Sequence, residues 1–402
     1  MSGAELEWDD LDGEADDTSE PVSSEDVTRA VVTDTDWTAE TILSQLRRGN
    51  IQLNPRFQRR DAWNKPRKSR FIESLILGLP IPQIVLAEDR NKRGKFIVLD
   101  GKQRLLALRQ FAAGSSFAVS DGEEDFKGFG LTGLEVRQDL RLVTLAKMEK
   151  GDEHLDDLNA FLNETIRTVV VRRWPSEDFL NLVFLRLNTG SVKLSPQELR
   201  QALHPGDFTD YLDDVASEST ALRSALRNGR PDFRMRDVEI LLRYFAFHYM
   251  LEEYSGNLKK FLDDTVNCLN DMWQSDEGDI RAAGEDCERA INATFEIFGE
   301  NAFYRWSNNR YEGRFNRAVF DVMTYYFSDE EVAARAIEGR EAVVNAFQSL
   351  CETSPSFVES IQTTTKTVTA THRRLSMWGE KLAEALEMEL QIPQLSENRI
   401  TV

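Results

Sequence analysis

The stretch VLDGKQRLLAL, residues 98–108, decides the fold of the N-terminal half of the chain, because a β-branched run changes there into a helical pattern. The run that contains it, KFIVLDG, follows a similar run, PQIVLAED, and the charged turn RNKRG separates the two. This arrangement predicts a β-hairpin. The second strand continues directly into KQRLLALRQFAAG, so we expect a strand-to-helix junction at Asp100 and Gly101.

Further elements flank this hairpin. Thr38 can cap a helix over TAETILSQLRRG, and Gly49 stands just past its end. KPRKSRFIESLIL predicts a second helix, RTVVVRRW a later strand, and SEDFLNLVFLRLN the helix after it. IQLNPRFQRRDAW, between the first two helices, is predicted to be extended. Helices and strands that alternate in this way indicate an α/β domain.

The second half of the chain has a different pattern. From about Ser195 onward the periodic segments are almost wholly helical, and 402 residues exceed what one hydrophobic core usually organises. We therefore expect an α+β protein with an α/β domain before a mostly α-helical domain. The predicted parts are an acidic disordered tail over 1–36, the α/β domain over 37–200, the helical domain over 201–388 and a C-terminal tail over 389–402.

The negative charge of the chain is concentrated at its N-terminus. The net charge is −20, but residues 1–36 alone contain 13 acidic side chains and one arginine. The remaining residues carry 48 basic and 56 acidic side chains, so a basic surface there is allowed. The acidic segment is expected to be a solubilising extension, a lure for a basic partner, or a segment that folds back over the chain's own basic site.

Several function classes are excluded by what the sequence lacks. No stretch approaches the length of an uncharged membrane span, and the N-terminus has no basic end followed by an apolar run, so we expect a cytoplasmic protein. A P-loop is absent, because Phe96 stands where the first glycine of the GxxxxGK motif would lie. The four histidines are not paired at metal-ligand spacing, which excludes zinc hydrolysis and HNH-type nuclease chemistry.

The strand-to-helix junction is the strongest candidate for a functional site. The first backbone N–H groups of a helix favour an anion, and a glycine lets the backbone approach a phosphate closely. Lys102 and Arg104 add charge-assisted donors, Gln103 adds an amide, and Asp100 can hold a metal ion. The alternative is that Asp100 is only a helix cap and Lys102 a solvated surface charge.

A second basic cluster precedes the junction. Seven basic residues and one acid, Asp61, lie between Arg56 and Arg70. Two positive clusters in one small α/β unit are what a polyphosphate site needs, and we assign Gln58 and Arg59 to it. A solvated, arginine-rich helix face explains the residues from Lys65 onward equally well.

Four motifs follow one another along the chain: PRFQR at 55–59 with Trp63, LILGLPIP at 75–82, DGKQR at 100–104 and FLRLNTG at 184–190. Together they resemble the N-terminal domain of GmrSD-type modification-dependent restriction enzymes, a family of ParB/sulfiredoxin-like fold that includes the SspE protein of phosphorothioate-linked defence. Lys102 is a departure, since the family usually has glutamine there.

The resemblance implies nucleotide binding and hydrolysis by the DGQQR-type motif, coupled to DNA sensing or cleavage in antiphage defence. The implied cofactors are a nucleoside triphosphate and Mg²⁺, with Asp100 as the metal ligand. The expected catalytic residues are Arg59, Asp100, Gln103 and Arg104. The expected nucleotide-binding residues are Gln58, Arg59, Gly101, Lys102, Gln103, Arg104 and Asn188.

Residues around the last motif have a structural explanation. Ser195, Pro196 and Glu198 form a complete helix capping box, whereas Asn188 can also reach a phosphate or metal ion. More weakly, the sequence predicts that three residues of the helical part border the site. They are Arg234, Arg236 and Asp237.

No nuclease motif follows the α/β domain, so we expect that the chain does not cut DNA alone. The expected partners are DNA, a separate effector or nuclease subunit, and a second copy of the chain. Two alternatives remain open. One is a ParB-like, nucleotide-switched DNA-binding regulator without significant turnover, and the other is an interaction subunit with an inactive site.

Overall fold

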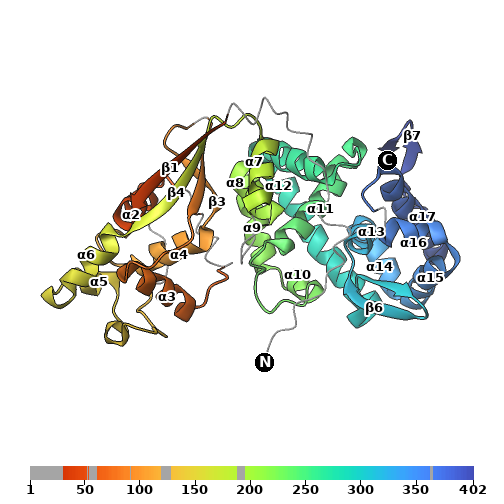
Figure 1. Ribbon diagram of the computed structural model, residues 1–402. Helices are drawn as coiled ribbons and strands as arrows, with labels where there is room; N and C mark the ends of the chain where they lie inside the picture. The colour runs from red at the N-terminus through yellow and green to blue at the C-terminus, as the bar shows by residue number, and fades with distance from the viewer. Residues whose placement is uncertain are drawn as a thin grey trace. The chain divides into compact units, whose positions relative to one another are not determined.

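The computed structural model describes residues 30–51, 53, 61–90, 92–118, 128–187, 195–362 and 365–402. These residues form two compact units that divide between Leu203 and His204. The predicted class is confirmed, because a mixed sheet with helices lies in the first unit and a helical region follows it (Figure 1). In the described residues no helix is both long enough and apolar enough to cross a membrane.

A four-stranded mixed sheet organises the first unit. Its strand order is β1-β4-β2-β3, and only β4 and β2 are parallel neighbours. The predicted hairpin is confirmed as the antiparallel pair β2 and β3. The strands are β1 (Val31–Thr38), β2 (Ile84–Glu88), β3 (Phe96–Asp100) and β4 (Thr165–Arg172).

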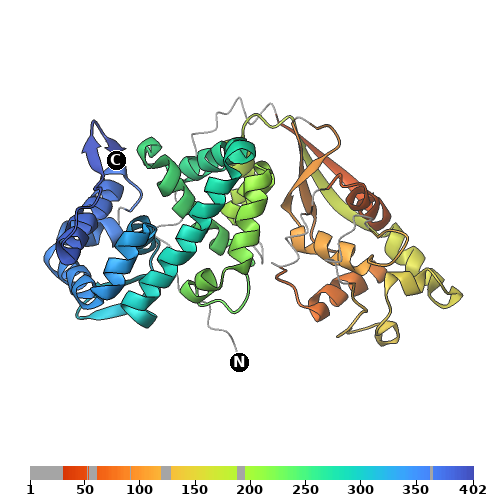
Figure 2. The same cartoon turned by 180° about the vertical axis from the view of Figure 1, so that it is seen from behind.

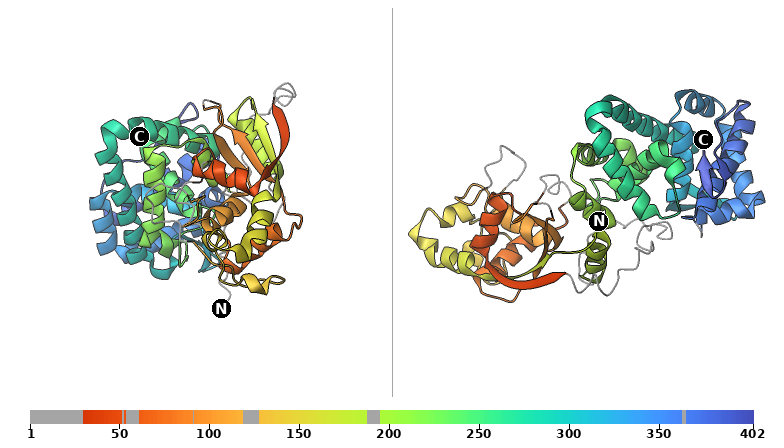
Figure 3. Two further views of the ribbon diagram at one scale, coloured as in Figure 1. Left: turned by 90° about the vertical axis from the view of Figure 1, so that its left-hand side faces the viewer. Right: turned by 90° about the horizontal axis from the view of Figure 1, so that it is seen from above.

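Helices cover both faces of this sheet. One face packs its apolar side chains, such as Val85 and Leu99, against α7 and α8. On the other side lie α2, α3, α4 and α6, with α4 packed against both α2 and α3 (Figure 3). These helices are α2 (Ala39–Arg47), α3 (Lys65–Ile76), α4 (Lys102–Phe111), α5 (Leu145–Met148), α6 (Leu155–Asn163), α7 (Glu177–Leu187) and α8 (Pro196–Leu203).

Side-chain caps explain where two of these helices begin. The Thr38 side chain accepts a hydrogen bond from the backbone of Thr41, as the sequence predicts. Asn64 does the same for α3 by accepting from the backbone of Arg67 at 3.0 Å. Gly49 has a φ of +61°, in the left-handed region that suits a glycine just past a helix end.

The second unit is a bundle around the long helix α12 (Figure 2). The periodic segments LKKFLDDTVNCLNDMW and IRAAGEDCERAINATFEIFG predict two separate helices here, but the structure joins them across a kink at Asp276. Helix α12 packs against α9, α11, α13, α14 and α15. The helices are α9 (Asp207–Glu218), α10 (Thr220–Ala225), α11 (Arg236–Met250), α12 (Leu258–Phe298), α13 (Arg317–Phe327), α14 (Glu330–Glu338), α15 (Arg340–Thr353), α16 (Pro355–Gln362) and α17 (Val368–Leu386).

The ends of the described chain differ from the prediction. The sequence predicts a disordered tail up to position 36, but β1 begins at Val31 and pairs with β4 along its whole length. This strand lies at the edge of the sheet and buries little, so apolar periodicity does not reveal it. The residues predicted to be a C-terminal tail contain a hairpin of β7 (Gln394–Ser396) and β8 (Arg399–Thr401). The side chain of Ile400 in β8 is fully buried.

A third difference lies between α12 and α13. The sequence gives no strand in this region, whereas the structure has the antiparallel pair β5 (Tyr304–Ser307) and β6 (Arg310–Phe315). Asn308 and Asn309 form its turn, with φ values of +50° and +58°. Asparagine tolerates this left-handed conformation, which matches the twist of a tight hairpin.

Candidate functional site

The predicted strand-to-helix junction is present. Strand β3 ends at Asp100, and Gly101 precedes the first residue of α4 with a φ of +99°. A Cβ atom at Gly101 would lie 3.0 Å from the Ile84 Cγ1 atom, so a larger residue would be both strained and crowded. Gly101 stands at the N-cap position and supplies no side-chain cap to α4. The first backbone N–H groups of a helix have no intrahelical partner.

Asp100 and Arg104 form an ion pair across the first turn of α4. The Arg104 Nη2 atom donates to the Asp100 Oδ2 atom at 2.9 Å and to the Gln83 carbonyl oxygen at 2.9 Å. The Asp100 side chain remains 38% exposed, whereas that of Arg104 is 13% exposed. The arginine therefore holds the carboxylate in place while leaving it open to solvent.

Two buried polar atoms in the same turn have no hydrogen-bond partner among the described residues. They are the Gln103 Oε1 atom and the Arg104 Nε atom. Gln103 is 9% exposed, so water does not readily replace a missing partner. Unsatisfied buried polar groups are rare, and a bound ligand is one accepted explanation for them.

Lys102 is not a solvated surface charge, which is the alternative that the sequence leaves open. The structure buries Lys102 and pairs its Nζ atom with the Glu198 Oε1 atom at 2.5 Å. Both side chains are 5% exposed. Glu198 also completes the predicted capping box, because its Oε2 atom accepts from the Ser195 N–H at 2.8 Å. One carboxylate thus joins the start of α8 to the start of α4.

The part of the second basic cluster that the structure describes is only partly a solvated helix face. Lys65, Arg67 and Arg70 are exposed, as that alternative predicts. Lys68 is instead buried, where its ammonium group contacts the Asp61 carboxylate and donates to the Gln110 Oε1 atom at 2.7 Å. Each of these two charges thus has an oppositely charged partner.

Three predicted site residues, Gln58, Arg59 and Asn188, lie outside the described residues. The residues predicted to border the site from the helical part form a local network in the second unit. The Arg236 side chain donates to the Asp232 Oδ2 atom at 2.7 Å, and the Asp237 Oδ2 atom accepts from the Asp232 N–H at 3.1 Å. Asp232 Oδ1 accepts from the backbone of Arg234. These hydrogen bonds give the polar residues of this loop a structural role.

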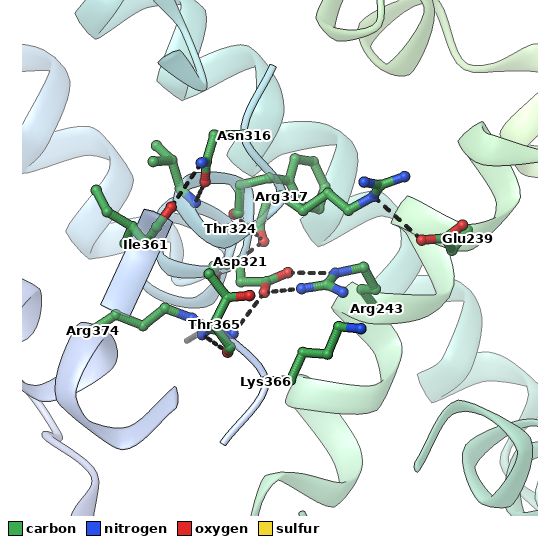
Figure 4. A network of polar contacts seen from close by, with 12 residues as sticks. Glu239, Arg243, Asn316, Arg317, Asp321, Thr324, Ile361, Thr365, Lys366 and Arg374 are labelled. Atoms are coloured by element: carbon green, nitrogen blue, oxygen red, sulfur yellow. Dashed lines mark hydrogen bonds and ion pairs between the residues drawn. The ribbon is translucent and has the colours of Figure 1, made fainter. Parts of the chain in front are cut away.

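A buried charge network in the second unit is not predicted from the sequence. The Asp321 carboxylate accepts hydrogen bonds from the Arg243 Nε atom at 3.0 Å and from the Arg374 Nη2 atom at 3.1 Å (Figure 4). All three side chains are at most 2% exposed. The sequence signals are two single charges within apolar runs, Arg243 in ILLRYFAF and Asp321 in AVFDVM. Among the described residues, no group of three or more His, Cys, Asp or Glu side chains is arranged to hold a metal ion.

The motif resemblance is confirmed by comparison with known families. Residues 39–205 match the family model described as GmrSD restriction endonuclease, N-terminal domain. This part of the chain is therefore similar to the GmrSD-type N-terminal domain, and the match associates the chain with restriction and antiphage defence. Neither the comparison with curated proteins nor that with solved structures yields a match.

Proposed function

We propose that this chain binds and hydrolyses a nucleoside triphosphate at the β3–α4 junction. In this proposal the chain is a component of a restriction or antiphage defence system and acts on DNA together with a separate effector protein. The match to the GmrSD N-terminal domain supports the cellular setting. The geometry of the junction supports the choice of a polyphosphate ligand.

The observation that carries the proposal is the start of α4 at a left-handed glycine, Gly101, directly after β3. Backbone N–H groups at a helix N-terminus bind phosphate. The Gln103 Oε1 and Arg104 Nε atoms lie in the same turn without partners among the described residues. A phosphate accepts from the guanidinium, while the Gln103 oxygen accepts from a donor such as a ribose hydroxyl or a bound water.

Asp100 fits the role of a magnesium ligand. Mg²⁺ in nucleotide sites is usually held by one or two carboxylates, by waters and by the phosphates themselves. The Asp100 Oδ2 atom accepts from Arg104, and the Asp100 side chain is 38% exposed. The ion would neutralise phosphate charge. Arg104 would keep the carboxylate in a fixed position.

Lys102 has a positioning role in this proposal. Its ammonium group is engaged by Glu198, so it sets the conformation of the helix start through the ion pair. Because buried ion pairs are sensitive to loss of one partner, a change at either residue would move the first turn of α4. Gln58, Arg59 and Asn188 remain proposed ligands on the strength of the family motifs.

Phosphate release is the direct test of turnover. The full chain would be incubated with Mg²⁺ and ATP, GTP, CTP or UTP, each with and without duplex DNA. We expect one or more nucleotides to release phosphate, and Asp100→Asn to abolish the release. Asp139→Asn is the matched control, since Asp139 is an exposed partner of Arg137 on the same unit. Release that is equal in both variants would contradict the proposal.

A nucleotide-switched binder without turnover is the second candidate. The Arg104 guanidinium already donates to Asp100 and to the Gln83 carbonyl oxygen, which favours a fixed binding role over transition-state stabilisation. Nucleotide-dependent thermal stabilisation without phosphate release would identify this function.

A further inference from the structure

The turn between β2 and β3 is basic and lies beside the end of β4. Arg90, Lys92, Arg93 and Lys95 belong to this turn, and Arg173 directly follows β4. The parallel register aligns Ala87 of β2 with Val171 of β4, which brings the end of β4 to the turn. Segments that are far apart in sequence therefore supply one basic surface. We call it the basic tip.

The two acidic side chains of the basic tip are engaged by its own backbone. The Glu88 Oε1 atom accepts from the Gly94 N–H at 3.0 Å, and the Asp89 Oδ1 atom accepts from the Lys92 N–H at 3.1 Å. Glu88 also contacts the Arg172 guanidinium at 3.4 Å. These contacts shape the turn.

Contacts with Trp174 hold the basic tip in position. The Arg90 Nε and Nη2 atoms donate to the Trp174 carbonyl oxygen at 3.0 and 2.8 Å, and the guanidinium lies 4.1 Å from the centre of the indole ring. The indole Nε1 atom in turn donates to the Glu88 carbonyl oxygen at 2.7 Å. The Lys95 Nζ atom donates to the Gly49 carbonyl oxygen. A surface held in this way loses little conformational entropy when it binds a partner.

Three cations of the basic tip are directed to solvent. The side chains of Lys92, Arg93 and Arg173 are exposed, and their charged groups have no hydrogen bond or ion pair with another described residue. Arg173 has a φ of +51°, in the left-handed region that a non-glycine residue adopts only when its surroundings require it. An excess of unpaired cations on a rigid support attracts a polyanion.

We infer that the basic tip binds the phosphate backbone of duplex DNA, an inference that rests on the proposed function for the choice of DNA as the polyanion. The tip is distinct from the nucleotide site. Asp100 pairs with Val85 at one end of the hairpin, and Phe96 pairs with Glu88 at the other. Four residues of strand separate the two ends by about 13 Å. DNA and nucleotide can therefore bind the same hairpin at opposite ends.

The salt dependence of DNA affinity tests this inference. The full chain with Lys92→Ala, Arg93→Ala and Arg173→Ala would be compared with the parent, using a short fluorescent duplex at about 50 to 200 mM salt. Loss of three phosphate contacts should reduce the slope of log affinity against log salt by about 2 to 3. At 100 mM salt the affinity should fall on the order of 100-fold.

The matched control removes three exposed cations elsewhere on the same unit, with the same change in net charge. It carries Arg141→Ala, Lys147→Ala and Lys150→Ala. We expect its DNA affinity and salt slope to stay close to those of the parent. Equal losses in both triple variants, no loss in the basic-tip variant, or a parent chain that binds an acidic protein surface but no duplex would each overturn the inference.

Nucleotide binding is measured separately on the parent and on both triple variants. Thermal stabilisation by a nucleoside triphosphate should be unchanged in both triple variants, and their melting temperatures without ligand should match that of the parent. A parent chain that is stabilised by no nucleotide, but whose DNA binding depends on the basic tip, would contradict the proposed nucleotide function while supporting the DNA surface.

Discussion

Gly101 fixes the geometry of the candidate site at the scale of single residues. Its φ of +99° allows the chain to turn from β3 into α4, and a Cβ atom at this position would lie only 3.0 Å from the Ile84 Cγ1 atom. The turn brings Asp100 and Arg104 into contact four residues apart. The backbone conformation of one glycine thus sets the relative position of the two charged side chains.

Gly101→Ala should therefore destabilise the first unit by about 1 to 2 kcal/mol, because an alanine is strained in the left-handed region and crowds Ile84. The same change should weaken nucleotide binding. Gly151→Ala is the control, since Gly151 has open space around its Cβ position, and its effect should stay within about 0.5 kcal/mol. Urea unfolding measures both. Equal stability of the two variants would show that the turn tolerates a side chain.

The junction is predicted from local pattern, whereas its neighbours are not. A β-branched run followed by Asp100-Gly101 and a helical pattern is a signal within a few residues, and the structure confirms it. The partner of Lys102 is Glu198, 96 residues away, and no local pattern connects two such positions. The capping box at Ser195 and Glu198 is again local and is confirmed, but its second role is not visible in the sequence.

At the scale of secondary structure, the ion pair between α4 and α8 links two helices on different sides of the sheet. Lys102 is the first residue of α4, and Glu198 lies in the first turn of α8. Both charges are almost fully buried. The pair therefore couples the start of α4 to the last helix of the first unit.

A double-mutant cycle tests this coupling. Lys102→Met or Glu198→Leu alone should destabilise the first unit by about 3 to 5 kcal/mol, because each leaves a buried charge unpaired. The double variant should be more stable than either single variant, because no buried charge is left unpaired. Relative to the parent, it should still lose about 1 kcal/mol because the cap at Ser195 is missing. Unfolding midpoints in urea provide the free energies. Simple additivity of the two single effects would mean that the ion pair does not act as a unit.

Some elements were predicted and others were not, for identifiable reasons. Helices with a continuous apolar face, such as α2 and α3, follow from their periodicity. Strand β1 is an edge strand that hydrogen bonds to β4 but buries few side chains, so its sequence resembles the acidic tail before it. The short strands β7 and β8 are hard to predict for the same reason, because Ile400 is their main buried side chain.

At the scale of the whole molecule, charge is divided unevenly along the chain. Residues 37–203 contain 27 basic and 21 acidic side chains, whereas residues 204–402 contain 21 basic and 35 acidic side chains. The excess of positive charge therefore belongs to the domain that matches the GmrSD family model. This distribution favours the first unit as the part that binds polyanions, despite the net charge of −20.

The helical unit depends on its buried charge network for stability. Asp321→Asn removes the negative charge that Arg243 and Arg374 share, and should destabilise this unit by about 3 to 5 kcal/mol. Asp264→Asn is the control, because its pair with Lys260 is largely exposed and should contribute less than about 1 kcal/mol. Chemical unfolding monitored by circular dichroism distinguishes the two. A loss at Asp321 as small as that of the control would contradict a structural role for the network.

Equilibrium binding of labelled nucleoside triphosphates to the full chain tests the central claim most directly. In the presence of Mg²⁺, the parent should bind one or more of the four nucleotides, and Arg104→Ala should weaken binding by about 10- to 150-fold through the loss of a charge-assisted contact of about 1.5 to 3 kcal/mol. Arg137→Ala, which removes an arginine that pairs with Asp139 and Asp157 in the same unit, should bind as the parent does. Equal affinity in all three proteins, or no binding by the parent, would contradict a nucleotide site at the β3–α4 junction.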